Sequence, residues 1–197
     1  MAEIGVARAV VVDNTDAQQG AGRVGVRFPW HSRPDAIHWA PIAAPMAGRD
    51  RGLWFRPEPG DEVLLAFERG DLRHPYVVGG VWSRSGPPPA PSAGGGRDLR
   101  MIRTRSGHTL VFDDADGGRV ELSLGDGKRL AIDDRTVSLT DEHGNGLTIQ
   151  SASGDVTVRA AGALRLEATQ ISIESSGPTS ITSSAVLTLA GTLVHIN

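Results

Sequence analysis

The chain has 197 residues, no cysteine and a formal net charge of −3 at pH 7. This length allows one ordinary domain or two small ones, and the absence of cysteine excludes disulfides and thiolate metal sites. The sequence shows neither a secretory leader nor an apolar run of membrane-spanning length. We therefore expect synthesis in the cytoplasm without a signal peptide, and export by another route.

Charge is distributed unevenly along the chain. Residues 1–105 contain 14 arginines and 11 acidic residues, whereas residues 106–197 contain 6 basic and 12 acidic residues. The arginines of the first half are interleaved with acids, which is a weak indication of nucleic-acid binding. The acidic second half argues against contact with a phosphate backbone there.

The first motif is Gly-Ala-Gly-Arg-Val-Gly at residues 20–25, which has the glycine spacing of a dinucleotide-binding loop. Such a loop needs a strand before it and a helix directly after it, to receive the pyrophosphate. Here Val24, Val26 and Phe28 alternate along the chain, and Pro29 prevents an early helix. The pattern predicts a hairpin turn, and no cofactor is expected.

Residues 1–83 have the pattern of an all-β domain. Short apolar runs separated by turn-forming clusters predict strands at 4–12, 23–28, 37–44, 62–68 and 76–82. A short helix could lie near 46–52. Five strands of this length suggest a small barrel, and the OB-fold is the five-stranded barrel of that size. Residues 84–100 form a Pro/Gly-rich linker by composition.

Residues 101–197 follow a different pattern, since no aromatic residue occurs after Phe112. Pairs of apolar residues at alternate positions begin with Leu110/Phe112 and, from Val156 onward, recur in steps of 7 or 8 residues. A short fixed step marks a repeat architecture. We expect the core of the repeat to contain the following residues: Val156, Val158, Leu164, Leu166, Ile171, Ile173, Leu187 and Leu189.

A repeat of this kind favours a β-prism wound from several identical chains over an ordinary β-sandwich, whose strands vary more in length and whose core usually contains aromatic rings. One chain alone would leave a narrow apolar stripe and unpaired strand edges in water. Three chains around one axis would pair each strand with neighbours from other chains and bury the stripe. A narrow triangular interior accepts Val, Ile and Leu but excludes Trp. The fold class expected is therefore an all-β chain with a barrel and a trimeric shaft.

The sequence offers only weak signals for chemistry. His31, Ser32 and Asp35 are triad residue types within one polar loop, and residues 113–118, Asp-Asp-Ala-Asp-Gly-Gly, lack the glycine position of a calcium loop. Three copies of His195 could ring a threefold axis and bind a metal, but alternation with Val194 and Ile196 points His195 outward. We expect no catalytic residue, cofactor or metal.

Five blocks of sequence resemble a known family. They are GRVGVRFPW (22–30), WAPIAAPMAG (39–48), GLWFRPEPGDEVLLAFERGD (52–71), HPYVVGGVW (74–82) and IRTRSGHTLVFDD (102–114). In this order they resemble the VgrG and phage baseplate-protein-V spike family. The closing GTLVHIN (191–197) resembles the blunt end of the β-helix in that family. The resemblance implies an OB-fold domain at 1–83, the linker at 84–100 and an intertwined, triple-stranded β-helix at 101–197.

The resemblance also implies a function and a set of partners. The chain would be the homotrimeric, membrane-piercing spike of a contractile injection system. A tail-hub trimer would bind above the barrel, and a PAAR-repeat protein, with effector cargo in some systems, would bind the tip. The implied tip residues are Leu193, Val194, His195, Ile196 and Asn197. Because the chain begins at a barrel strand, we expect a separate hub polypeptide, as in phage-like particles.

Two other functions remain open from the residues alone. An OB-fold nucleic-acid binder could stack bases on Trp30, Trp39, Trp54 or Trp82, although these side chains are expected in the barrel core or the trimer contact. A carbohydrate-cleaving fibre would need paired carboxylates. Glu167 and Glu174, the only glutamates of residues 156–197, are seven apart and expected to face solvent.

Overall fold

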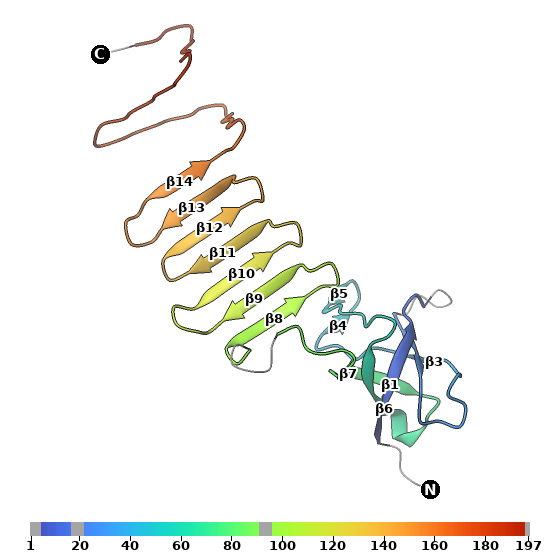
Figure 1. Ribbon diagram of the computed structural model, residues 1–197. Coiled ribbons are helices and arrows are strands. Elements are labelled where there is room, and N and C mark those ends of the chain that lie inside the picture. The colour runs from blue at the N-terminus through green and yellow to red at the C-terminus, as the bar shows by residue number, and fades with distance from the viewer. Residues whose placement is uncertain (1–4, 17–21, 91–95, 196–197) are drawn as a thin grey trace.

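The computed structural model describes residues 5–16, 22–90 and 96–195, and it is an all-β structure within them (Figure 1). Apart from strands and loops, the described residues contain one short 3-10 helix, η1 (Glu68–Gly70). Two main sheets follow each other along the chain: a curled five-stranded sheet and an extended seven-stranded sheet. None of the described segments forms a helix long and apolar enough to cross a membrane.

The first sheet closes into a barrel. Its strands are β1 (Val6–Asp13), β2 (Val24–Arg27), β3 (His38–Ala40), β6 (Glu62–Phe67) and β7 (Pro75–Gly80), paired in the order β3-β2-β1-β6-β7. After β3 the chain meets β7 in parallel, because the Val77 amide donates to the Pro41 carbonyl and the Ala43 amide to that of Val77, at 2.9 and 2.8 Å. Closure satisfies both sheet edges. The five-stranded closed barrel confirms the OB-fold expectation.

The barrel core contains small and branched side chains together with two phenylalanines. Strand alternation buries these residues on the inner side: Ala9, Val11, Val24, Val26, Phe28, Ala40, Val63, Leu65, Phe67 and Val77. None of the four tryptophans is among them. They were expected in the barrel core or in the trimer contact, so the first of these two places is wrong and the second stays a prediction. A five-stranded barrel has a narrow interior, which alternating valines already fill, and the indole rings remain on the outside.

The segment near 46–52 is a small hairpin, not the helix considered from the sequence. Strands β4 (Ala47–Gly48) and β5 (Arg51–Gly52) pair across a two-residue turn in which Asp50 has a φ of 56°. Gly52 has a φ of +146°, and a Cβ there would lie 2.5 Å from the Met46 carbonyl oxygen. Glycine is the residue that tolerates both conditions, and they prevent a helix.

The second sheet is a meander in which every strand pairs with its neighbour in sequence. The strands are β8 (Leu99–Arg103), β9 (Thr109–Asp113), β10 (Arg119–Ser123), β11 (Arg129–Asp133), β12 (Thr136–Thr140), β13 (Gly146–Gln150) and β14 (Val156–Arg159). The expectation that each strand pairs with other chains is therefore wrong for residues 99–159. β8 also begins inside the segment assigned to the linker. Residues 160–195 contain no strand and extend beyond β14 (Figure 1).

The buried barrel core predicts a specific pattern of stability changes. Leu65→Ala should lower the free energy of unfolding of the barrel by about 2–5 kcal/mol, because it leaves a cavity at a fully buried site. All four tryptophans lie at or before residue 82, so tryptophan fluorescence during urea unfolding follows the barrel alone. Val78→Ala, at an exposed position of β7, is the matched control and should cost less than about 0.5 kcal/mol. Equal losses in both variants would contradict the assigned core.

Candidate assembly surface

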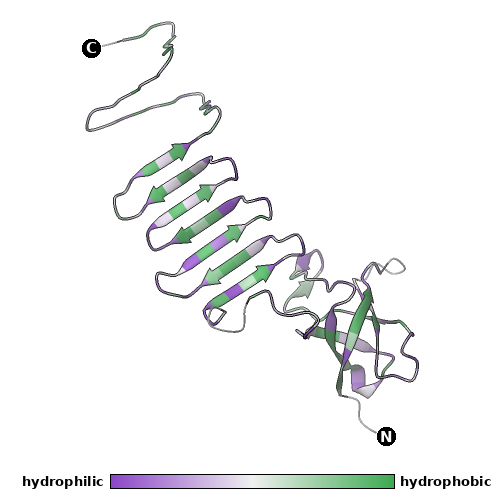
Figure 2. Cartoon of the chain, viewed as in Figure 1, coloured by the Kyte–Doolittle hydropathy of each residue, from purple (hydrophilic) through white to green (hydrophobic). Residues whose placement is uncertain are grey.

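One face of the seven-stranded sheet is apolar from β9 to β14, and in β8 it carries Ile102 and Arg100. Strand alternation places two side chains of each strand on this face, and the register aligns them across neighbouring strands; for example, Leu122 opposes Leu110 on one side and Leu130 on the other. Figure 2 shows the alternation of hydrophobic and hydrophilic residues along these strands. We call this surface the apolar face. It consists of two columns that run across all seven strands.

The two columns differ in side-chain shape. The first, the Leu column, contains Ile102, Leu110, Leu122, Leu130, Leu139, Leu147 and Val158. The second, the Val/Ile column, contains Phe112, Val120, Ile132, Val137, Ile149 and Val156, with Arg100 at its β8 position. Apart from Leu110 and Val137, which are half-buried, the apolar members are 36–62% exposed. Contiguous exposed apolar surface of this extent marks an interaction site.

The opposite face of the sheet is polar and forms its contacts within the chain. Glu121 lies between two arginines, with its Oε2 atom 2.7 Å from Arg129 Nη2 and 3.5 Å from Arg119 Nη1. Thr109 and Ser123 share a hydroxyl hydrogen bond of 2.6 Å across β9 and β10. Ala131, at the centre of β11, is 2% exposed beneath the longer side chains. The polar side chains of this face can remain in contact with water. The apolar face is therefore the surface of the sheet that a partner would bury.

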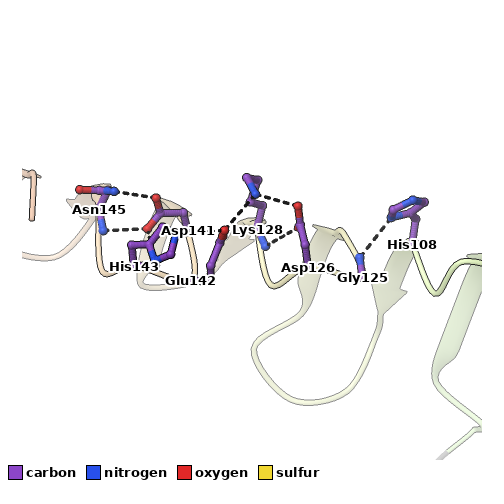
Figure 3. Close-up of polar contacts among 8 residues, drawn as sticks. All are labelled: His108, Gly125, Asp126, Lys128, Asp141, Glu142, His143 and Asn145. Atoms are coloured by element: carbon purple, nitrogen blue, oxygen red, sulfur yellow. Dashed lines mark hydrogen bonds and ion pairs between the residues drawn. The ribbon is translucent and has the colours of Figure 1, made fainter.

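The turns along one edge of the sheet are joined by polar side chains (Figure 3). The Gly125 amide donates to His108 Nδ1 at 3.1 Å, which joins the β10–β11 turn to the start of β9. Lys128 Nζ binds Asp126 Oδ2 at 2.7 Å and Glu142 Oε1 at 3.2 Å, which joins that turn to the β12–β13 turn. The hydrogen bond that Lys128 donates lowers the pKa of Asp126. The pKa of Glu142 is lowered first by a hydrogen bond from its own backbone amide and then by the bond from Lys128. These contacts hold the turns at this edge in place.

The last of these turns is built on Asp141. Its Oδ1 atom accepts the His143 and Asn145 amides, both at 2.9 Å, and its Oδ2 atom accepts Asn145 Nδ2 at 2.6 Å. The side-chain bond from Asn145 is the largest cause of a lowered pKa at Asp141. Asn145 Oδ1 in turn accepts the Ala161 amide at 2.7 Å. This contact attaches the segment after β14 to the sheet.

The residues expected in the shaft core divide into two groups. Val156 and Val158 lie in β14 and complete the two columns of the apolar face. The others lie after the last strand and are 52–73% exposed: Leu164, Leu166, Ile171, Ile173, Leu187 and Leu189. Of the expected tip residues, Leu193, Val194 and His195 are exposed, and Ile196 and Asn197 lie outside the described residues. The tip and core assignments after residue 159 stay predictions.

The residues considered for chemistry lie apart from one another in the structure or form local turn contacts. Within the described residues, no group of three or more His, Asp or Glu side chains is placed to hold a metal ion. The Arg33 amide donates to His31 Nδ1 within the loop that also holds Asp35, which is a local turn contact. Asp113 Oδ1 accepts the Ala115 amide, as in a turn, and Glu174 accepts a bond from Ser172. Glu167 and Glu174 are both exposed.

The tryptophans of the barrel form separate local contacts. Trp30 stacks on Phe28 with ring centroids 5.4 Å apart and donates its Nε1 hydrogen to the Arg8 carbonyl at 2.9 Å. Phe28 stacks on its other partner, His38, at 4.2 Å, and burial lowers the pKa of that imidazole. Trp39 and Trp54 lie under arginine guanidinium groups. Each of these ring contacts covers one face of a ring, and Trp30, Trp54 and Trp82 remain 47%, 64% and 66% exposed.

The barrel meets the first turn of the sheet at a polar contact. Arg105 Nη1, between β8 and β9, lies 2.6 Å from Glu58 Oε2 of the barrel, and both side chains are exposed. Beside this contact a hollow of about 770 Å³ is lined by residues that include Phe55, Trp82 and Arg103. Trp82 is 66% exposed there. An exposed pair of this kind contributes at most about 1 kcal/mol, so it orients the sheet more than it stabilises it.

The alternation of the apolar face could be predicted from the sequence, but its division into two columns of different side-chain shape was missed. The turn sequences contained a signal that could have predicted this division. Asp-Gly and Asn-Gly pairs at 116–117, 126–127 and 145–146 mark tight connections about ten residues apart or further. Such connections imply hairpins within one chain, and hairpin pairing places Leu opposite Leu and Val opposite Ile.

Comparison with known proteins places the barrel in a family. Residues 7–82 match the family profile described as the type VI secretion system/phage-baseplate injector OB domain. Two curated relatives from Pseudomonas aeruginosa are the type VI secretion system spike proteins VgrG2a and VgrG2b. Each is 36% identical over 72 residues, which is 34% of this chain but only 9% and 7% of the relatives. The chain thus spans less than a tenth of the length of these relatives, and the likeness concerns the barrel.

The Asp141 turn predicts a pH-dependent contribution to stability. Because the folded pKa is below the ordinary value of 3.8, the contribution is fully present above pH 3.8 and is lost as the pH falls through the folded pKa. Asp141→Ala should therefore lower the melting temperature of the sheet, followed by circular dichroism at pH 7, and the difference from wild type should shrink in acid. Asp116→Ala, in a turn at the other edge, is the control. A difference that grows below pH 3.8 would contradict the assignment.

Proposed function

On the premise that its barrel belongs to the injector OB-domain family, we propose that the chain forms a homotrimeric central spike in the baseplate of a contractile injection system. The observation that carries the proposal is the uncovered apolar face on the sheet that follows this barrel. The sheets of three copies form the first part of a shaft, with their apolar faces directed to a common axis. The function is mechanical and requires no bond-making chemistry.

The surface area of the chain supports an assembly of copies. One chain exposes 15576 Å². A compact monomer of 20.7 kDa would expose about 8,900 Å². Part of the excess reflects an elongated shape, but a standard interface needs only about 800 Å² from each partner. The area available for burial is therefore far larger than a stable trimer requires.

The length of the strands favours three copies over four. Five residues of strand span about 17 Å, at roughly 3.3 Å per residue. A triangle with sides of about 17 Å places each sheet about 5 Å from the axis, which is half of the roughly 10 Å between packed sheets. Four sheets would lie about 8.5 Å from the axis and leave a void that Leu, Val and Ile cannot fill. Three copies fill the interior with the two apolar residues that each strand provides.

Residues 160–195 form the distal part of the proposed shaft. Their apolar residues recur in steps of 7 or 8 residues, yet the single chain provides them with no strand partner. In the proposed trimer these segments wind around the axis and pair with the other two chains as a triple-stranded β-helix. The buried stripe would then contain Leu164, Leu166, Ile171, Ile173 and their later equivalents.

The proposed partners are those that the family resemblance implies. The barrel binds a tail-hub trimer, and residues 193–197 bind a PAAR-type tip protein, with effector cargo in some systems. Contraction of the apparatus drives this end into the target-cell membrane. The relatives of Pseudomonas aeruginosa that are similar to the barrel are named spike proteins, which supports the spike role.

The oligomeric state is the first test of the proposal. Light scattering coupled to size exclusion should give a mass of 3 × 20.7, about 62 kDa. The trimer should elute early for that mass, because the sheet extends away from the barrel (Figure 1). A compact monomer of 20.7 kDa would eliminate both the shaft and the spike.

Neighbouring residues of β14 lie on opposite faces of the sheet, so substitutions there should differ in their effect on the trimer. Val156→Asp should prevent trimerisation or make the trimer dissociate in SDS, because it brings three unpaired carboxylates into the apolar interior. Thr157→Asp, on the polar face of the same strand, is the matched control and should leave the trimer intact. Ile173→Asp should act like Val156→Asp if the distal segment is wound as proposed. Dissociation of the Thr157 variant alone would reverse the assigned faces.

A further inference from the structure

We propose that the three copies join through unlike columns: at each corner of the prism, the Leu column of one copy packs against the Val/Ile column of the next. This inference rests on the proposed trimer and adds the identity of the contacting surfaces. It is carried by the sorting of side-chain shapes between the two columns of the apolar face.

The columns lie along opposite edges of the sheet. Leu122 and Leu130 are next to the turn at 124–128, which belongs to the edge drawn in Figure 3. Val120 and Ile132 are next to the turns at 114–118 and 134–135, at the other edge. A ring of three identical copies is heterologous, so each interface joins one edge of a copy to the opposite edge of its neighbour. The Leu column therefore meets the Val/Ile column at every corner.

The geometry of the triangle gives the distances. Leu130 and Ile132 lie on either side of the centre of β11, each about 3.3 Å from it along the strand. With the sheets about 5 Å from the axis, the Cα atoms of Leu130 in one copy and Ile132 in the next are about 5 Å apart. Like residues of two copies are about 10 Å apart on the same geometry. Contact across a corner is thus between unlike columns.

Side-chain shape is consistent with this pairing. A γ-branched leucine extends further from its backbone than a β-branched valine or isoleucine, whose bulk lies close to the strand. In β10 to β13 each strand places a leucine in one column and a valine or isoleucine in the other, so a long side chain lies opposite a short one at these four levels. This alternation fills the interior evenly. Arg100 interrupts the Val/Ile column at β8, where its Nη1 atom lies 3.0 Å from Asp114 Oδ2. The paired columns therefore begin at Phe112 and Leu110 in β9.

A second copy of this chain is the occupant that fits the apolar face. From β9 to β14 neither column contains a charged or polar residue. Each column has one residue per strand. A second copy has the same spacing between strands, so each strand of one copy meets the same strand of the next copy at the same level along the axis. The chain exposes more surface than a compact monomer of its mass, and this additional area is sufficient for an interface with a neighbour on each of its two sides.

Disulfide trapping tests the pairing, since the chain has no cysteine of its own. Leu130→Cys and Ile132→Cys chains, one with a tag that changes its mass, are co-expressed, confirmed as trimers by light scattering and oxidised. A disulfide needs Cα atoms about 4.4–6.8 Å apart. On a non-reducing gel we expect a dimer of the two different chains, and no dimer from either variant expressed alone. Leu139→Cys with Val137→Cys repeats the test one strand further along.

The control pair is Ser138→Cys with Thr148→Cys, on the polar face, which should give no dimer. Like-with-like dimers of Leu130→Cys alone would overturn the pairing. Trimers that form no disulfide in either cysteine pair would overturn it too, while leaving the proposed trimer intact. A monomeric wild-type chain would instead overturn the proposed spike and the pairing together.

Discussion

The rest of the structure depends on an apolar face that the chain cannot cover by itself. Alternation along seven strands directs the polar side chains of the sheet, apart from Arg100 in β8, to one side or to the turns, and many of them pair within the chain. The other side exposes two columns of Leu, Val and Ile. At roughly 25 cal/mol per Å² of apolar surface removed from water, burial of this face would stabilise the molecule substantially. The barrel, in contrast, has a closed edge and a filled core of its own.

Much of the fold could be predicted from the sequence because its signals are local. The barrel strands appear as short apolar runs between Gly, Pro and Asp clusters, and each lies within a few residues of its expected position. The absence of aromatic residues after Phe112 correctly indicated a different architecture there. Alternation also predicted which side chains share a face, as Val156 and Val158 illustrate. The family assignment came from the ordered blocks of the barrel and is confirmed over residues 7–82.

The features that sequence reasoning missed depend on tertiary context. Alternation is the same whether a strand pairs with its own chain or with another, so it could not show that β8 to β14 form a meander. The tryptophans were expected in the barrel core or the trimer contact, because aromatic residues favour cores and interfaces, but the narrow barrel interior is filled largely by valines and does not contain them. The hairpin at 47–52 depends on the backbone angles of Asp50 and Gly52, which composition alone does not reveal. The sorting of Leu from Val and Ile becomes visible only once the register is known.

The meander has a consequence for the order in which the proposed shaft forms. Each of its pairings joins consecutive strands, so the contacts are local in sequence and the entropy of loop closure is small. Each sheet can therefore form on an isolated, newly made chain, at a rate that does not depend on protein concentration. The distal segment has no such local partner and must wait for an encounter of three chains. The hydrogen bond from the Ala161 amide to Asn145 lies at the boundary between the part that folds within one chain and the part that needs three chains. The proposed shaft would therefore form from the barrel toward the tip.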